Sequence, residues 1–393
     1  MPGTVTLFLA GDVMTGRGVD QILPHPGGPT LRESYVKDAR DYVELAETRS
    51  GAIPRPAGYD WPWGIALSVL DECAPDVRIV NLETSVTTSR DYAPEKGIHY
   101  RMNPANVEVV TVARVDVCTL ANNHVLDFGV RGLRESVEVL TAAGLRLAGA
   151  GGDDRLAWRP ATVPVGACRV RVWSVGAVSS GIAPWWAATA TRPGVALLPE
   201  VSEAGADGLL ARIDADRAAG DVVVVSVHWG SNWGYAVPDE HVRFAHRLID
   251  GGVDVVHGHS SHHPRPLEVY RGKPVLYGCG DLINDYEGIG GYERFRDELR
   301  LLYVVSFDAD SRELRELRMM PVRARRMRLE HVTQSQERWL RAALEESSAI
   351  FGTRLRAAGG RRPVDPARAV SRRGQPPGRA TGTPSTTRST ASL

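Results

Sequence analysis

Short runs of Val, Ile and Leu recur along the chain and alternate with stretches that have helical periodicity. Runs of this kind are typical of strands that are covered by helices, so the alternation predicts an α/β fold. The runs span residues 5–10, 77–80, 115–120, 170–175, 222–227, 253–256 and 275–277. The intervening helices are expected over residues 63–72, 106–113, 130–143, 201–219 and 239–250.

Polar clusters follow most of these runs at the point where the apolar stretch ends. They read Gly11-Asp12, Asn81-Leu82-Glu83, Asn122-Asn123-His124, His228-Trp229-Gly230, His257-Gly258-His259 and Gly278-Cys279-Gly280-Asp281. Ligands of open α/β sheets bind beyond the carboxyl ends of the strands. We therefore expect these clusters to converge on one edge, and this convergence is the main functional signal in the sequence.

Histidines are concentrated near these clusters, since seven of the eleven lie between His228 and His263. Mixed sets of imidazole and carboxylate oxygen hold Zn, Mn or Fe in hydrolytic sites. The sequence therefore predicts a divalent metal centre with one or two ions. The expected ligands are Asp12, Glu83, Asn123, His228, His259 and His262, with His257 and His263 in supporting positions.

Each predicted ligand also has a structural alternative. Asp12 could cap a helix or a turn, and Glu83 could lie at the surface with its charge in water. His241 and His246 fall within an expected helix, where surface or packing roles are the simpler interpretation.

Two further residue pairs suggest roles around the metal. His124 is expected to donate a proton to the leaving group, and Asp127, three residues later, is expected to orient that imidazole. Arg17 and Arg101 are candidates for gripping an anionic substrate, although both could equally be solvated arginines.

Charge and composition exclude several classes of protein. The chain carries 47 basic and 47 acidic residues, so it has no net field that would gather nucleic acid. The N-terminal apolar run is far shorter than the ~20 residues that cross a membrane, which predicts a soluble, cytoplasmic protein. We expect a main domain over residues 1–330, a C-terminal helix over 331–358 and a disordered basic tail over 359–393.

Seven motifs occur in an order that resembles a known family. They read GDVMTGRG, NLETSVT, YRMNP, LANNHVLDFG, GAGGD, VHWG and HGHSSHHPRPLEVYRGKPVLYG, within residues 4–325. This pattern resembles the CapA family of capsule synthesis (poly-gamma-glutamate biosynthesis) proteins, which is similar in fold to calcineurin-like metallophosphoesterases. The resemblance implies a sandwich of two mixed β-sheets flanked by helices, with a metal centre at the strand ends.

The chain also departs from the phosphoesterase pattern. Met14 stands where phosphoesterases have the His of an Asp-x-His element, and a thioether is a poor ligand for the ions that are usual there. Glu83 stands where they have Asp, and Gly278-Cys279-Gly280-Asp281 replaces the Ser-Leu-Gly-Asn of many CapA relatives.

Three functional hypotheses remain open on the sequence. The first is a metal-dependent hydrolase of phosphoester or related bonds, linked to capsule or poly-gamma-glutamate metabolism, with a small-molecule or polymer anion as its substrate. The second is a non-catalytic component of polyglutamate or capsule polymer assembly. The third is a metal-dependent gamma-glutamyl amidase that uses the same residues.

Overall fold

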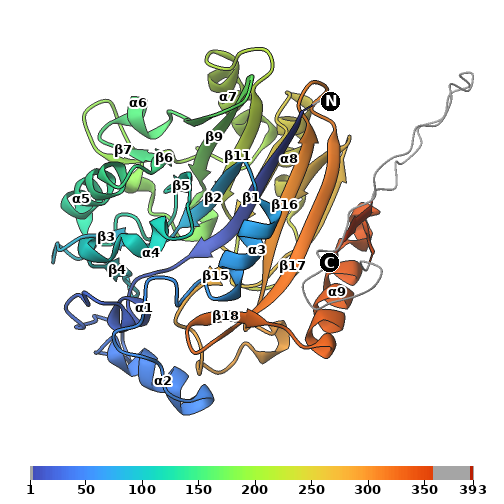
Figure 1. The fold of residues 1–393 in the computed structure, drawn as a ribbon. Helices are drawn as coiled ribbons and strands as arrows, with labels where there is room; N and C mark the ends of the chain where they lie inside the picture. Colours follow the sequence, from blue (N-terminus) through green and yellow to red (C-terminus); the bar gives the residue numbers. More distant parts are fainter. Residues whose placement is uncertain (1–2, 357–389, 393) are drawn as a thin grey trace, which may run out of the picture.

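Two β-sheets pack face to face in the computed structural model, which describes residues 3–356 and 390–392 (Figure 1). The larger sheet has the strand order β19-β20-β17-β16-β1-β2-β5-β6, with β15 beside β1 and β18 beside β17. The second sheet has the order β13-β14-β12-β11-β9-β8. Both sheets are mixed, because β1 is parallel to β2 but antiparallel to β16, and β9 is parallel to β11 but antiparallel to β8.

The strands and helices have the following bounds. The larger sheet contains β1 (Thr4–Val13), β2 (Val77–Leu82), β5 (Val117–Thr119), β6 (Arg146–Ala148), β15 (Asp281–Ile283), β16 (Leu299–Asp308), β17 (Leu314–Arg325), β18 (Arg328–His331), β19 (Arg354–Arg356) and β20 (Thr390–Ser392). The second contains β8 (Ala161–Val165), β9 (Cys168–Gly176), β11 (Val222–His228), β12 (Val255–His259), β13 (Leu267–Tyr270) and β14 (Lys273–Leu276). Two short pairs are β3 (Ser85–Val86) with β4 (Arg101–Met102), and β7 (Ala150–Gly151) with β10 (Gly194–Val195). The helices are α1 (Gly18–Ile22), α2 (Arg40–Ser50), α3 (Ile65–Cys73), α4 (Glu108–Thr111), α5 (Gly129–Ala142), α6 (Asp154–Ala157), α7 (Glu203–Asp214), α8 (Asp239–Asp250) and α9 (Gln334–Ser348).

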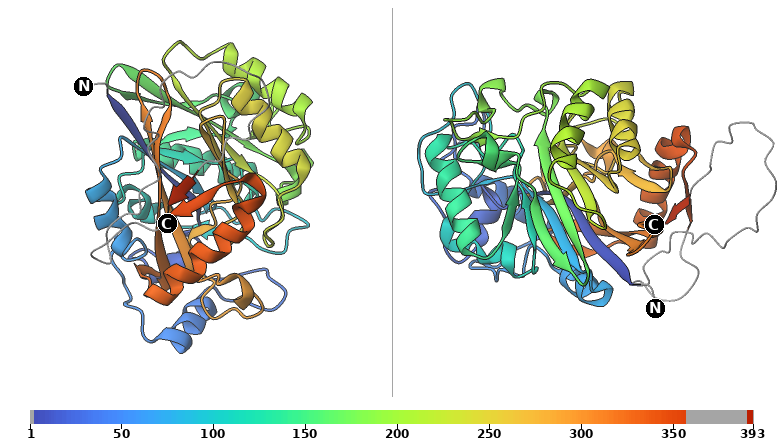
Figure 2. Two further views of the ribbon diagram at one scale, coloured as in Figure 1. Left: turned by 90° about the vertical axis from the view of Figure 1, so that its right-hand side faces the viewer. Right: turned by 90° about the horizontal axis from the view of Figure 1, so that it is seen from above.

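Alternation along β1 shows how the layers form. Leu7 and Leu9 point into the core between the two sheets, whereas Phe8 and Ala10 point to the opposite face. Buried side chains of α2, α3, α4 and α5 belong to the core on that opposite face. The helices α7 and α8 cover the outer face of the second sheet (Figure 2). The chain is therefore a sandwich of two mixed sheets flanked by helices, which is the fold class that the sequence predicts.

The predicted elements agree with the structure in most places. Every predicted run contains or overlaps a strand, and α8 spans the residues expected for it. The predicted runs do not include β16, which is mostly apolar but contains Arg300, Ser306 and Asp308. The N-terminal run was expected to end at Ala10, but β1 continues to Val13 through a shift of register between Ala10 and Asp12.

Two expectations concern the termini and the membrane. Within the described residues, the helices are all too short or too polar to cross a membrane. The expected C-terminal helix corresponds to α9, which is followed by β19. The disordered tail predicted over 359–393 lies outside the described residues, except for Thr390–Ser392, which form β20 between β19 and β17.

The backbone of Gly11, at the register shift of β1, packs closely against the backbone of Gly280, and a substitution can test this packing. A Cβ atom at Gly11 would lie 1.7 Å from the carbonyl oxygen of Gly280, which is backbone and therefore not free to move aside. We expect Gly11→Ala to lower the free energy of unfolding by about 1–3 kcal/mol, as overpacking does. Urea denaturation measures this change.

Gly208→Ala is the matched control. Gly208 is exposed on α7, and a Cβ there meets nothing within 4 Å. The control should leave stability unchanged or raise it by up to about 1 kcal/mol, because Ala favours a helix over Gly. Equal changes in the free energy of unfolding for Gly11→Ala and Gly208→Ala would contradict the close packing at Gly11.

Candidate metal centre

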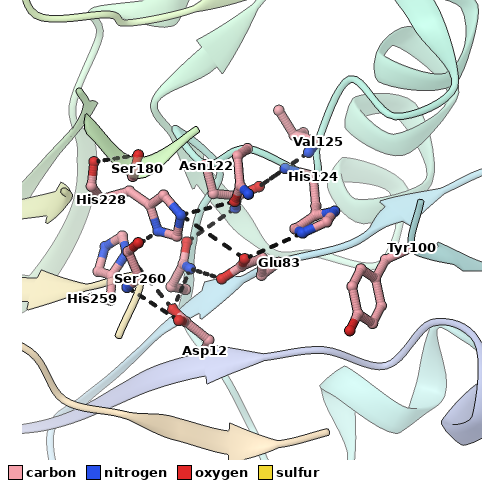
Figure 3. A network of polar contacts seen from close by, with 12 residues as sticks. Asp12, Glu83, Tyr100, Asn122, His124, Val125, Ser180, His228, His259 and Ser260 are labelled. Atoms are coloured by element: carbon pink, nitrogen blue, oxygen red, sulfur yellow. Dashed lines mark hydrogen bonds and ion pairs between the residues drawn. The ribbon is translucent and has the colours of Figure 1, made fainter. Parts of the chain in front are cut away.

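Acidic and imidazole side chains from both sheets meet at one edge of the sandwich (Figure 3). The larger sheet contributes carboxylates: Asp12 from β1 and Glu83 directly after β2. The second sheet contributes imidazoles: His228 ends β11 and His259 ends β12. Neither sheet alone supplies both kinds of group, so the cluster forms only when the two sheets pack together.

Asp12 belongs to two groups that could each hold an ion. One group is Asp12, His228 and His259, and the other is Asp12, His262 and Asp281; within each, the ligand atoms lie within 4.8 Å of one another. All five residues are buried. A carboxylate shared by two sets of ligands is the arrangement of two-metal sites, in which one carboxylate bridges the ions.

Hydrogen bonds hold these carboxylates in place. The side-chain amide of Asn81 donates to Asp12 Oδ1 at 2.7 Å, and the backbone N–H of Ser260 donates to Asp12 Oδ2 at 3.1 Å. Asn284 donates to Asp281 Oδ2 at 2.6 Å. The orientation of each carboxylate is thus fixed before any ligand binds, which is what the surroundings of metal ligands generally do.

The two imidazoles face each other and an amide oxygen. Nδ1 of His228 lies 2.8 Å from Nδ1 of His259, and Nε2 of His228 lies 2.9 Å from Oδ1 of Asn123. Oε1 of Glu83 lies 3.9 Å from Nε2 of His228. Asn123 and Glu83 therefore lie beside the first group, and their role as ligands stays a prediction.

Burial determines the charge state of the cluster. It raises the pKa of Asp12 to about 7, with a further contribution from the Asp281 carboxylate. It also raises the pKa of Glu83, where Asp12 adds to the effect, and lowers the pKa of both His228 and His259. The imidazoles are thus neutral and have lone pairs to offer, while the crowded carboxylates repel one another.

This donor set fits a divalent cation. Neutral imidazoles and carboxylate oxygens are the ligands that Zn, Mn and Fe take in proteins, and a cation would offset the repulsion among the buried carboxylates. Residues Asp12, Glu83, Asn123, His228, His259, His262 and Asp281 could hold one or two ions.

His124 lies next to this cluster. Its Nε2 is 3.7 Å from Oε1 of Glu83, and its Nδ1 is 2.7 Å from Oδ2 of Asp127. Lys96 contacts the same Nδ1 at 3.1 Å and also pairs with the Asp127 carboxylate. Burial lowers the pKa of His124 to about 4, although the Asp127 carboxylate acts in the opposite direction.

The two arginines predicted to bind substrate are held by protein oxygens. Arg17 is buried, and its guanidinium contacts both oxygens of Asp285 and one oxygen of Glu33. Arg101 donates to the carbonyl oxygens of Ser89 and Gly28, each at 2.9 Å. Their substrate-binding role stays a prediction, and nothing in their contacts supports it.

The four other histidines between His228 and His263 have hydrogen-bond or stacking partners of their own. His257 bonds to the carbonyl of Ala10 through Nε2 at 2.7 Å, and His263 accepts from the backbone N–H of Gly234. His241 stacks on Trp229, and His246 bonds to Glu268. The supporting and packing roles expected for these residues stay predictions.

Asp281 was not among the predicted ligands, although a signal for it existed. It follows a glycine at a strand end, as Asp12 does, and the two residues are direct partners in the pairing of β15 with β1. Its motif, Gly278-Cys279-Gly280-Asp281, is one of the polar clusters expected at the strand ends, but Asp281 itself is not among the expected ligands. Lys96 was also missed, because no local motif links it to His124.

A sandwich with a carboxylate and imidazole cluster at its strand ends defines an α/β protein with a candidate divalent metal site. The chain matches the family model "Bacterial capsule synthesis protein PGA_cap" over residues 6–286. It therefore belongs to the PGA_cap family of bacterial capsule synthesis proteins, which confirms the resemblance stated above.

Two sequence relatives, from Mycobacterium tuberculosis and Bacillus subtilis, agree with this assignment. The chain is 54% identical over 356 residues to the probable polyglutamine synthesis accessory protein of Mycobacterium tuberculosis H37Rv, covering 90% of this chain and 94% of that one. It is 28% identical over 298 residues to the PGA biosynthesis protein CapA of Bacillus subtilis 168, covering 75% and 66%. A phosphatase structure from Mycoplasma pneumoniae is similar at a TM-score of 0.45 and 12% identity, over 82% of this chain and 95% of that one.

Because Asp12 belongs to both groups of candidate ligands, its substitution should remove more metal than substitution of Asp281 does. We expect about two ions per chain in protein reconstituted with Mn or Zn, a loss of both in Asp12→Asn, and a loss of one in Asp281→Asn. Elemental analysis after desalting measures these contents. His331→Ala is the control, because His331 is exposed on β18 far along the sheet. Unchanged metal in Asp12→Asn would contradict the assignment.

The raised pKa of Asp12 predicts how the metal-free protein responds to pH. The pKa of Asp12 is about 7 in the folded state and about 4 in the unfolded state. Between these two pH values the folded state therefore binds more protons at Asp12 than the unfolded state does. The contribution of Asp12 to the stability of EDTA-treated protein should therefore fall as pH rises from about 4 to about 7, whereas the buried histidines with lowered pKa values contribute in the opposite direction. Thermal melts of wild type and Asp12→Asn isolate the Asp12 contribution: the stability of wild type relative to the variant should fall over this range. A difference in stability between the two proteins that does not change with pH, or that grows as pH rises, would contradict it.

Proposed function

We propose that this protein is a metal-dependent hydrolase of phosphoester or related bonds, with a substrate drawn from capsule or polyglutamate metabolism. The observation that carries the proposal is the position of His124. One ring nitrogen is held by Asp127 and the other faces the candidate metal cluster across Glu83. A protein that only held metal for stability would not need an oriented imidazole there.

The residues around His124 prepare it to transfer a proton. The Asp127 carboxylate accepts from Nδ1–H, which leaves the lone pair of Nε2 directed toward the cluster. Because its pKa is about 4, the ring is neutral at neutral pH and, once protonated, gives up its proton readily. His124 would take a proton at Nε2 from the attacking water and give it to the leaving group.

Other residues of the site would hold the ion, place a positive charge beside His124 and restrict the His124 ring. A divalent ion held by the Asp12 cluster would supply Lewis-acid stabilisation of developing charge and lower the pKa of an attacking water. Lys96 lies beside Asp127 and within 5.1 Å of the Trp186 ring centroid, so it places a positive charge next to His124. Tyr100 packs edge-on against the His124 ring, with centroids 4.6 Å apart, and restricts its rotation.

The family and its relatives support the biological context of the proposal. The relative that is 54% identical bears the name of a probable polyglutamine synthesis accessory protein, and the family model is named for capsule synthesis. We propose that the substrate is an anionic polymer or small molecule from such a pathway. The positive charge of Lys96 beside the cluster is compatible with an anion.

The role of His124 predicts a specific kinetic result. His124→Ala should lower the turnover of a hydrolysed substrate by about 10²- to 10⁴-fold while metal content stays unchanged, because proton transfer alone is lost. The measurement compares hydrolysis of bis(p-nitrophenyl) phosphate and of gamma-glutamyl p-nitroanilide by metal-loaded protein. The first substrate reports phosphodiester cleavage and the second reports amide cleavage.

His246→Ala is the control, because His246 is on α8 and bonds to Glu268 away from the cluster. It should retain wild-type turnover. Wild-type turnover in His124→Ala with metal bound would show that His124 is not the proton donor. If metal-loaded wild type hydrolyses neither substrate nor a panel of phosphoesters and amides, the hydrolase proposal is wrong.

A further inference from the structure

Arg300 is a buried arginine on the strand that passes behind the metal centre. It is the second residue of β16, and 1% of its surface is exposed. Its neighbours Leu299 and Leu301 point into the core between the sheets. Alternation along the strand therefore directs Arg300 to the opposite face, toward the segment that follows β15.

The other buried arginines each donate to several protein oxygens, although Nε of Arg171 and of Arg265 has no partner, whereas Arg300 donates to one. Arg17, Arg78, Arg171 and Arg265 each donate to two or more protein oxygens. Among the described residues, Arg300 has one acceptor, the carbonyl of the adjacent Leu299 at 3.3 Å, and its Nε has none. A buried guanidinium in this state has a large desolvation cost and spare donors for a partner.

A cavity of about 140 Å³ lies against this guanidinium. Its wall includes four arginines, among them Arg300, Arg323 and Arg325, together with Asn284 and four carboxylates, among them Asp297. Arg323 and Arg325 already pair with Glu330. No ion pair joins Asp297 to Arg300 within the part of the chain that the structure describes. The volume accommodates a small anion together with water.

The cavity adjoins the metal centre. Asn284 lines the cavity and at the same time donates to Asp281, one of the candidate ligands. Asn284 therefore connects the wall of the cavity with the second group of ligands.

We propose that this cavity is an anion subsite, in which Arg300 binds a carboxylate or phosphate group of the ligand through two parallel N–H donors. A guanidinium matches the paired oxygens of either group, and a partner would supply the acceptors that Arg300 lacks. The subsite lies beside the metal centre, so an anionic substrate could occupy both. This role as part of a substrate site rests on the proposed function, but anion binding itself does not require turnover.

The test measures binding of two small anions to the full chain in EDTA, so that no metal can hold the anion. The probes are glutarate, a dicarboxylate, and inorganic phosphate, titrated by calorimetry. We expect wild type to bind one of them with millimolar affinity and Arg300→Met to bind it about 10-fold or more weakly, since a charged hydrogen-bonded pair is lost. Arg300→Lys keeps the positive charge but loses the paired N–H donors of the guanidinium, so its affinity should lie between those of wild type and Arg300→Met.

Arg325→Met is the matched control, because it removes a cation from the same wall whose guanidinium is already paired with Glu330. It should change the affinity by less than about 3-fold, as expected for a partly exposed pair. Glutarate binding identifies a carboxylate ligand, and phosphate binding identifies a phosphoryl ligand.

Two results would overturn the subsite: no binding of either anion by wild type at about 50 mM, or equal affinities of wild type and Arg300→Met. If Arg300→Met does not fold by circular dichroism, Arg300→Lys decides the question in the same way. Anion binding that depends on Arg300 in a protein without hydrolytic activity would leave the subsite standing and refute the proposed function alone.

Discussion

The buried carboxylate of Asp12 is the constraint on which the rest of the site depends. It lies where β1 shifts register between its neighbours β2 and β15, in a position that a glycine at residue 11 makes possible. An ionised carboxylate buried there is costly without a cation or several hydrogen-bond donors. Asn81 and Ser260 supply two donors, and the cluster around Asp12 has the composition to accept a cation as well.

The sandwich explains why the cluster has two chemical halves. The larger sheet brings carboxylates to the edge, through Asp12, Glu83 and Asp281, and the second sheet brings imidazoles, through His228 and His259. The apolar core between the sheets fixes the distance between these halves. A rigid scaffold of this kind positions ligands more accurately than flexible loops do.

Much of this arrangement was predictable from the sequence, because buried strands have a strong apolar signal and their ends are marked by polar residues. Asp12, His228 and His259 could be identified in this way. Asp281 could not be ranked as a ligand, since its importance follows from its pairing with Asp12 across β15 and β1. Lys96 and Arg300 depend even more on tertiary contacts, which no local pattern reveals.

The two arginine predictions show the same limit. Arg17 and Arg101 lie within motifs near the site, yet their guanidinium groups are engaged by Asp285, Glu33 and backbone oxygens. Arg300 lies in no motif and has the spare donors that those arginines lack. The availability of a charged group depends on what surrounds it in the fold, which sequence position alone does not give.

The most direct test of the account is a crystal structure of the protein soaked in manganese, with anomalous difference maps calculated at the cluster. The account predicts peaks on both sides of Asp12, one contacted by His228 and His259 and the other by His262 and Asp281, at about 2.0–2.3 Å from the ligand atoms. An empty cluster in which His228 and His259 still contact each other would contradict the central claim that these residues form a metal centre.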